Sequence, residues 1–152
     1  MLDKLGCASE KYKQVWFFAR LALILQKQKK MTSEVSYTSV VTVTEANTAQ
    51  AMSSGDLPVF ATPALAAVME NAAMLAARQL CDKGQTTVGS SIEVKHLSPS
   101  PIGATVFATA TLTGQEGRRL TFDIVAKDND KTIGTAVHSR YIVNIERFMN
   151  KL

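Results

Sequence analysis

The sequence predicts an α+β domain in which one long buried helix is wrapped by a five-stranded antiparallel sheet. Three observations support this: one strongly apolar helical segment, five segments of strand-like composition, and turn residues between them. The chain has 152 residues, 46% of them hydrophobic and 20% charged, which is enough to bury a core without a disulfide or metal staple. We expect this domain to span residues 31–152.

The first expected strand covers residues 34–44, which are rich in Val, Thr and Tyr and alternate in polarity. A short helical turn and a loop with Gly55 and Pro58 follow over residues 45–58. Beyond the helix come four more strand-like segments, which we expect to form an antiparallel meander. They are residues 86–97, 104–113, 118–128 and 131–145, with turns at 98–103, at 114–117 and around Asn129.

Residues 62–81 give the clearest helix signal. Thr62 suits the N-cap, Pro63 the first helical position and Gly84 the stop. Twelve of the 14 residues from 64 to 77 are apolar, so we expect the helix to be buried on all sides. Seven alanines keep it thin. A single buried helix closely wrapped by an antiparallel sheet is the hotdog arrangement.

The basic charge belongs to the first thirty residues, which hold seven Lys or Arg and two Asp or Glu, against ten and eleven in the rest. We therefore expect no nucleic-acid partner for the domain. Residues 1–30 are predicted to be a basic helical extension, either an accessory helix or a segment upstream of a start at Met31. Contact of residues 11–30 with an anionic membrane surface is the less favoured alternative.

Several kinds of site and location are not indicated. Cys7 and Cys81 have no CxxC spacing and no His cluster nearby, so we expect neither a metal site nor a disulfide scaffold. The apolar stretch 15–25 is too short to span a membrane and contains Arg20. No small-x-small cleavage site follows it. We expect a cytoplasmic protein.

Glu70 is the first candidate for chemistry, because a carboxylate in an apolar helix is costly unless it is paired or reaches a cleft. Thr62, Ala66 and Glu70 are spaced four residues apart and so lie on one helical face. Ala66 is small and leaves room for a ligand. The alternative is that Glu70 simply points to solvent.

His96 is the second candidate. Strand alternation predicts that it ends an inward face, and a carboxylate and an imidazole at one helix–sheet seam could share proton transfer. The alternative is a satisfied core histidine. His138 and Arg140 have the opposite parity to the expected inward residues of the last strand, so we expect them at the surface or a subunit interface. The two expected inward sets are Val88, Ser90, Ile92, Val94 and His96, and Ile133, Val137, Tyr141 and Val143.

Four segments together carry a resemblance to a known family: LPVFATPALAAVMENAA, TVGSSIEVKHLSPSPIGATV, GRRLTFDIVAKD and IGTAVHSRYIVNIERF. Over residues 35–150 the chain resembles the hotdog-fold thioesterases grouped with fluoroacetyl-CoA thioesterase. The resemblance implies a catalytic triad of Thr62, Glu70 and His96. It also implies that Gly89 lies near the bound acyl group, and we expect Pro63 and Ala66 to line the same site.

The resemblance further implies an acyl-CoA substrate, a homodimer or higher oligomer with its site at the subunit interface, and no metal or redox cofactor. CoA would be part of the substrate, and the fluorinated substrate does not carry over. The leading hypothesis is hydrolysis of a short-chain acyl-CoA thioester. The alternatives are a hotdog dehydratase or hydratase, or a non-catalytic acyl-CoA binding protein.

Overall fold

The computed structural model describes residues 34–152. The compact unit begins at Val35 and continues to Leu152. The predicted helical extension 1–30 lies outside the described residues, so that helix and the boundary at Met31 stay predictions. Among the described residues, no helix is long and apolar enough to cross a membrane.

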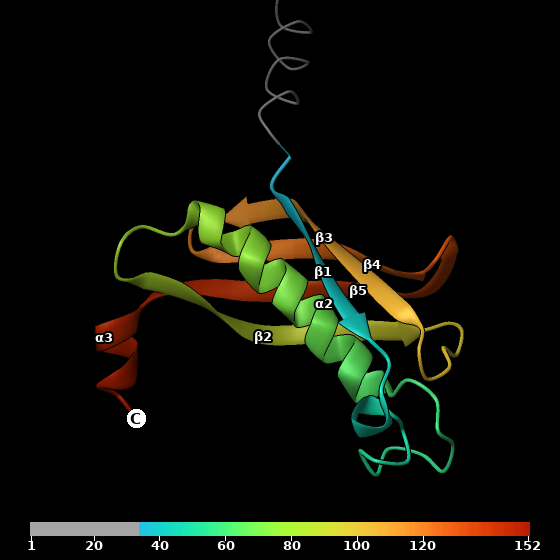
Figure 1. The fold of residues 1–152 in the computed structure, drawn as a ribbon. Helices are drawn as coiled ribbons and strands as arrows, with labels where there is room; N and C mark the ends of the chain where they lie inside the picture. Colours follow the sequence, from blue (N-terminus) through green and yellow to red (C-terminus); the bar gives the residue numbers. More distant parts are fainter. Residues whose placement is uncertain (1–33) are drawn as a thin grey trace, which may run out of the picture. The chain divides into compact units, whose positions relative to one another are not determined.

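The described chain forms five strands and one long helix, as predicted (Figure 1). In chain order the elements are β1 Ser36–Thr42, the 3-10 turn η1 Glu45–Asn47, α2 Thr62–Ala77, the 3-10 turn η2 Arg78–Leu80, β2 Gln85–His96, β3 Thr105–Glu116, β4 Arg119–Asp128, β5 Lys131–Asn144 and α3 Ile145–Met149. The short α3 was not predicted. The long helix ends before the predicted residue 81, and Gly84, at φ +82°, lies in the turn to β2.

The sheet is antiparallel, with strand order β1-β3-β4-β5-β2. The predicted meander is right for β3, β4 and β5 but wrong for β2, which pairs with β5 at the far edge of the sheet. The connection from β2 to β3 therefore crosses the sheet. As a result, β2 has one paired edge and one edge without a partner in the described chain.

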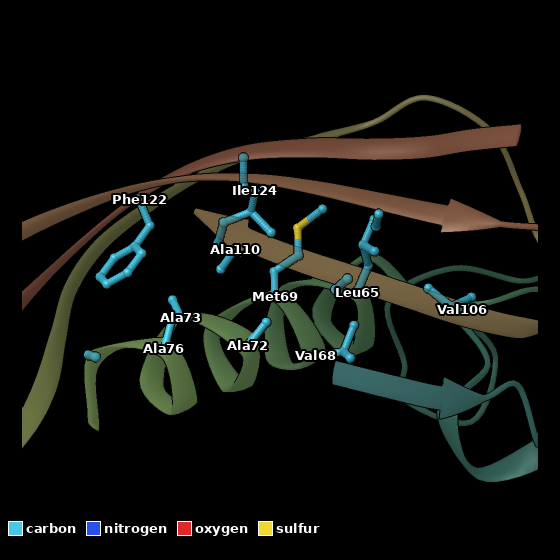
Figure 2. Packing of buried hydrophobic residues seen from close by; sticks show 14 of the residues in the cluster. Leu65, Val68, Met69, Ala72, Ala73, Ala76, Val106, Ala110, Phe122 and Ile124 are labelled. Atoms are coloured by element: carbon cyan, nitrogen blue, oxygen red, sulfur yellow. The ribbon is translucent and has the colours of Figure 1, made fainter. Parts of the chain in front are cut away.

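Helix α2 packs across one face of this sheet and supplies its small side chains to the core. Figure 2 shows Met69 pointing from the helix toward Ile124 and Ala110 of the sheet, with alanines of the next turns beneath Phe122. The helix is not buried on all sides, contrary to the prediction. Its N-terminal turn and one side along its length are open, where Thr62, Pro63, Ala67 and Asn71 are exposed and Ala66 and Glu70 are half-buried.

Two β-bulges determine which side chains face the helix. In β2 the pairing with β5 shifts between Gly89 and Ser91, so the alternation reverses there. Ile92, Val94 and His96 keep the predicted inward face, but Val88 does not. It pairs with the outward Tyr141, whereas Gly89 pairs with the inward Arg140.

A second register shift, opposite Ala126 and Lys127, reverses the alternation of β5 near Ile133. Ile133 is buried as predicted, but Val137 and Tyr141 are 51% and 40% exposed on the outer face. Their neighbours Ala136, His138, Arg140 and Ile142 take the inward face and are buried. The predicted surface position of His138 and Arg140 is therefore wrong.

Candidate active site

Thr62 and His96 meet at the start of α2. Thr62 Oγ1 and His96 Nδ1 are 2.9 Å apart and hydrogen-bonded. Thr62 is the first residue of the helix and not its N-cap, which is Ala61, and the helix has no side-chain cap. The hydroxyl predicted to cap the helix is instead directed to the imidazole, which lies at the end of β2.

A surface cleft of about 290 Å³ opens beside this pair. Thr62 and His96 line it together with Phe60, Leu97 and Pro99. Phe60 is buried, whereas Leu97 is 58% exposed. The cleft also includes Ser54 and Ser98, so it offers a mixed apolar and polar lining next to a hydroxyl and an imidazole, which suits a small group bearing a reactive carbonyl.

Burial lowers the pKa of His96 below its usual value, and the backbone of Ser98 partly offsets this effect. Its Nε2 is buried and has no hydrogen-bond partner within residues 34–152. A largely neutral imidazole beside a hydroxyl can accept that hydroxyl's proton, which is the arrangement of an activated nucleophile.

Glu70 lies two turns further along α2, and its side chain is 44% exposed. Its Oε1 is 3.6 Å from Nε2 of His138, the one ion-pair distance found in the described part of the chain. No hydrogen bond or ion pair joins Glu70 to His96 there. The structure therefore brings two of the three predicted catalytic residues into contact and places the third beside a different histidine.

Gly89 provides the space that the Glu70 carboxylate occupies. A Cβ at this position would lie 2.8 Å from Glu70 Oε1 and 3.1 Å from His138 Cε1. Such contacts are too short, so any side chain would displace the carboxylate or the ring. Gly89 thus lies beside Glu70, while Pro63 and Ala66 occupy the open side of the helix near Thr62, and the predicted roles of these three residues at an acyl site stay predictions.

His138, Arg140 and Thr87 form a buried polar cluster beneath Glu70 that the sequence did not predict. Arg140 is 6% exposed, and its guanidinium donates to Thr87 Oγ1 and to the Thr87 carbonyl, both at 2.9 Å, and to His138 Nε2 at 3.1 Å. The sequence shows an arginine in the last strand but not its burial. Unbroken alternation placed Arg140 on the outer face, because the bulge near Ile133 could not be recognised from the sequence.

His138 is fully buried, and burial is the main reason that its pKa is lowered. The neighbouring Arg140 charge lowers this pKa further, whereas the Ser91 carbonyl and Glu70 raise it. The cluster therefore holds a neutral imidazole between a buried cation and a partly exposed carboxylate.

No group of three or more His, Cys, Asp or Glu side chains within residues 34–152 could hold a metal ion. The functional groups found in the described site residues are a hydroxyl, two imidazoles, a carboxylate and a guanidinium.

Comparison with known proteins defines first the class and then the family. One solved structure, a hypothetical thioesterase-superfamily protein from Thermus thermophilus, is 22% identical and covers 78% of this chain and 88% of its own, with a TM-score of 0.72. That likeness shows that the fold is the hotdog fold, which confirms the predicted fold class.

The family follows from closer relatives. The model of the fluoroacetyl-CoA-specific thioesterase family matches residues 43–146. Fluoroacetyl-CoA thioesterase from Streptantibioticus cattleyicolor is 36% identical over 94 residues, which cover 62% of this chain and 68% of that protein. A crystal structure of a fluoroacetyl-CoA thioesterase has a TM-score of 0.72 at 31% identity and covers 80% of this chain and 94% of its own. The chain belongs to this family and is a thioester hydrolase, which confirms the predicted resemblance and enzyme class.

Proposed function

We propose that the protein hydrolyses a short-chain acyl-CoA thioester to the free acid and CoA. The observation that carries the proposal is the hydrogen bond of 2.9 Å between Thr62 and His96 beside a surface cleft. Solved relatives support a small acyl group. One, 29% identical, is a complex with acetyl-CoA, and another, 30% identical, is a complex with fluoroacetate and CoA.

A thioester carbonyl requires a nucleophile or activated water, a proton donor for the departing thiolate and donors for the oxyanion. In the proposed reaction His96 is the acid/base, Thr62 attacks or orients the carbonyl, and Glu70 serves as base or nucleophile. Where Thr62 or water attacks, the His96 ring takes the proton of the attacking group and returns it to the CoA sulfur. Where the Glu70 carboxylate attacks, it has no proton to give, and the CoA sulfur takes its proton from the water that then hydrolyses the acyl-enzyme anhydride. Water completes the reaction, and CoA enters only as part of the substrate.

The start of α2 offers two backbone donors for the oxyanion. Pro63 has no N–H, and the N–H of Leu65 is bonded to the Ala61 carbonyl. The N–H groups of Thr62 and Ala64 therefore remain without a bond among the described residues, and Ala64 N–H is the donor next to Thr62 at the positive end of the helix dipole. Pro63 and Ala66 flank this donor and would contact the acyl or pantetheine portion.

A panel of acyl-CoA thioesters of increasing length, followed with a thiol-reactive dye, tests the function. We expect thiol release to be fastest with short acyl groups. Enoyl-CoA substrates added to the panel show a change in enoyl absorbance if the protein is a hydratase. Binding without turnover across the panel, or hydration without thiol release, would contradict the proposal.

We also propose that the active form is a homodimer or higher homo-oligomer. Strand β2 is an edge strand, and Gly89, Ser90 and Ser91 along it are exposed beside the half-buried Glu70. An edge strand with free backbone groups is a template for pairing with another strand. A second copy joined along β2 would cover the open side of α2 and enclose the site.

Sedimentation velocity should therefore show at least a dimer, and specific activity should fall when the protein is diluted below the dimer dissociation constant. A monomer with full, dilution-independent activity would refute the assembly while leaving the hydrolase function intact.

A further inference from the structure

The hydrogen bonds of His138 determine which of its nitrogens carries the proton. Nδ1 lies 2.7 Å from the Ser91 carbonyl oxygen, which can only accept, so Nδ1 bears the hydrogen and donates it. Nε2 receives the N–H of Arg140 Nη1 at 3.1 Å. A nitrogen that accepts this bond carries no hydrogen, so the ring is the neutral Nδ1–H tautomer.

The same Nε2 faces Glu70 Oε1 at 3.6 Å. Nε2 can either accept from Arg140 or, if protonated, donate to Glu70, but it cannot do both. The two bonds exclude each other. In the arrangement observed, the bond to Arg140 is made and the carboxylate is left without a donor.

Arg140 and Glu70 carry opposite charges, which favours a direct ion pair between them. Both approach Gly89, where a Cβ would lie 2.8 Å from Glu70 Oε1 and 3.6 Å from Arg140 Nη1. No ion pair between them occurs in the described chain. Thr87 fixes two corners of the guanidinium, and the third corner, Nη1, is held by His138.

We propose that His138 is a positioning residue that keeps the Arg140 guanidinium from pairing with Glu70, so that the carboxylate remains free to act as the base of the hydrolase. This rests on the proposed function. Without the acceptor at Nε2, the planar guanidinium would shift as a unit on its Thr87 contacts, so that Nη1 donates to Glu70. A direct ion pair would make Glu70 a weaker base and a weaker nucleophile.

The charged and titratable groups around His138 are few. Glu70 faces it from α2 and Arg140 from its own strand, while β2 contributes the neutral Thr87, Gly89 and Ser91. Cys81, after η2, interacts electrostatically with Arg140, and burial is the main cause that raises the pKa of its thiol. Glu70 is therefore the only carboxylate beside the ring within residues 34–152.

Replacing His138 by Asn or by Gln, whose amides differ in length, tests the roles of its two ring nitrogens separately. His138→Asn keeps a donor near the Nδ1 position but has no acceptor at the Nε2 position. His138→Gln reaches that position with a carbonyl oxygen that can accept from Arg140. Both side chains are neutral, so the two variants differ in whether an acceptor for Arg140 lies at the Nε2 position.

In His138→Asn we expect kcat to fall about tenfold or more with KM nearly unchanged. The midpoint of the Glu70 carboxyl ¹³C NMR titration should also move down by about 1–3 pH units, the usual effect of a close opposite charge. His138→Gln should restore both values toward those of the wild type. The double variant His138→Asn, Arg140→Gln should lose the downward shift, because the released cation is gone.

The NMR titration is independent of turnover, so it still tests the positioning role if no thioester is hydrolysed. An unchanged titration in folded His138→Asn, or equal behaviour of the Asn and Gln variants, would overturn the proposal. If the variants do not fold, ¹⁵N NMR of the wild-type imidazoles decides: a bare Nε2 at neutral pH supports the proposal, and an Nε2–H tautomer or an imidazolium overturns it.

Discussion

Replacing Glu70 by alanine should lower the kcat of thioester hydrolysis by at least about 10²-fold, the scale of a lost acid/base group. The fold should survive. The side chain is 44% exposed and makes no hydrogen bond among the described residues, and its closest polar contact is the 3.6 Å approach to His138. A catalytic role and a structural role therefore predict different results.

The measurement is steady-state turnover of the best acyl-CoA beside thermal melting. Glu93→Ala is the matched control, since Glu93 is an exposed carboxylate on the outer side of β2, with Val137 as its partner on β5. It should leave both activity and melting unchanged. Wild-type turnover in folded Glu70→Ala would remove Glu70 from the mechanism.

The architecture was predictable because each element has a strong local signal. The run of apolar residues over 64–77 predicts a buried helix, and the alternation of polarity in five other segments predicts strands. All five strands form within a few residues of their predicted ends. The position of β2 in the sheet was not predictable in the same way. Strand order depends on which edges pair across long distances, and alternation says nothing about that.

The missed cluster has a specific physical cause. A period of two identifies an inward face only while the register is unbroken, and one extra residue reverses every side chain beyond it. The bulge near Ile133 reversed β5, which turned His138 and Arg140 inward. The bulge after Gly89 did the same for β2 and placed Gly89 opposite Arg140. Both errors fall at the candidate site, where bulges commonly re-aim side chains.

Thr62 does not cap the helix as its local sequence predicts, for a different physical reason. A threonine before proline at the start of a helix has the composition of an N-cap, and the sequence supports that role. In the structure the helix begins one residue earlier, and the Thr62 hydroxyl is hydrogen-bonded to His96, which lies 34 positions away in the chain. A local propensity was overruled by a contact between distant segments, and the result is a hydroxyl available for chemistry.

Replacing His96 by alanine should also lower kcat by about 10²-fold, and it should change the pH profile. Burial lowers the pKa of His96 below its usual value of about 6.5, and the Ser98 backbone only partly offsets this. The ring works as a base in its neutral form. Wild-type activity should therefore be full above that lowered pKa and fall as the pH drops through it, and the variant should lack this acidic limb.

The lowered pKa of His96 also determines whether the free energy of unfolding rises or falls with pH. Between the lowered pKa of folded His96 and about 6.5, the ring is neutral in the folded chain and protonated in the unfolded chain. The unfolded state then binds more protons, so the free energy of unfolding should rise with pH across this window. His138 has a lowered pKa as well and contributes with the same sign, so His96→Ala should reduce the slope and not abolish it.

Turnover and urea unfolding measured from pH 4.5 to 8 would test both effects, with Lys95→Ala as the control. Lys95 is the exposed neighbour of His96 on the opposite face of β2, so its removal should alter neither profile. If His96→Ala keeps wild-type kcat and the acidic limb, the Thr62–His96 bond has a structural role and the base must be sought elsewhere. If the limb disappears while the variant still unfolds cooperatively, the imidazole that accepts the Thr62 hydroxyl is the group that titrates in catalysis.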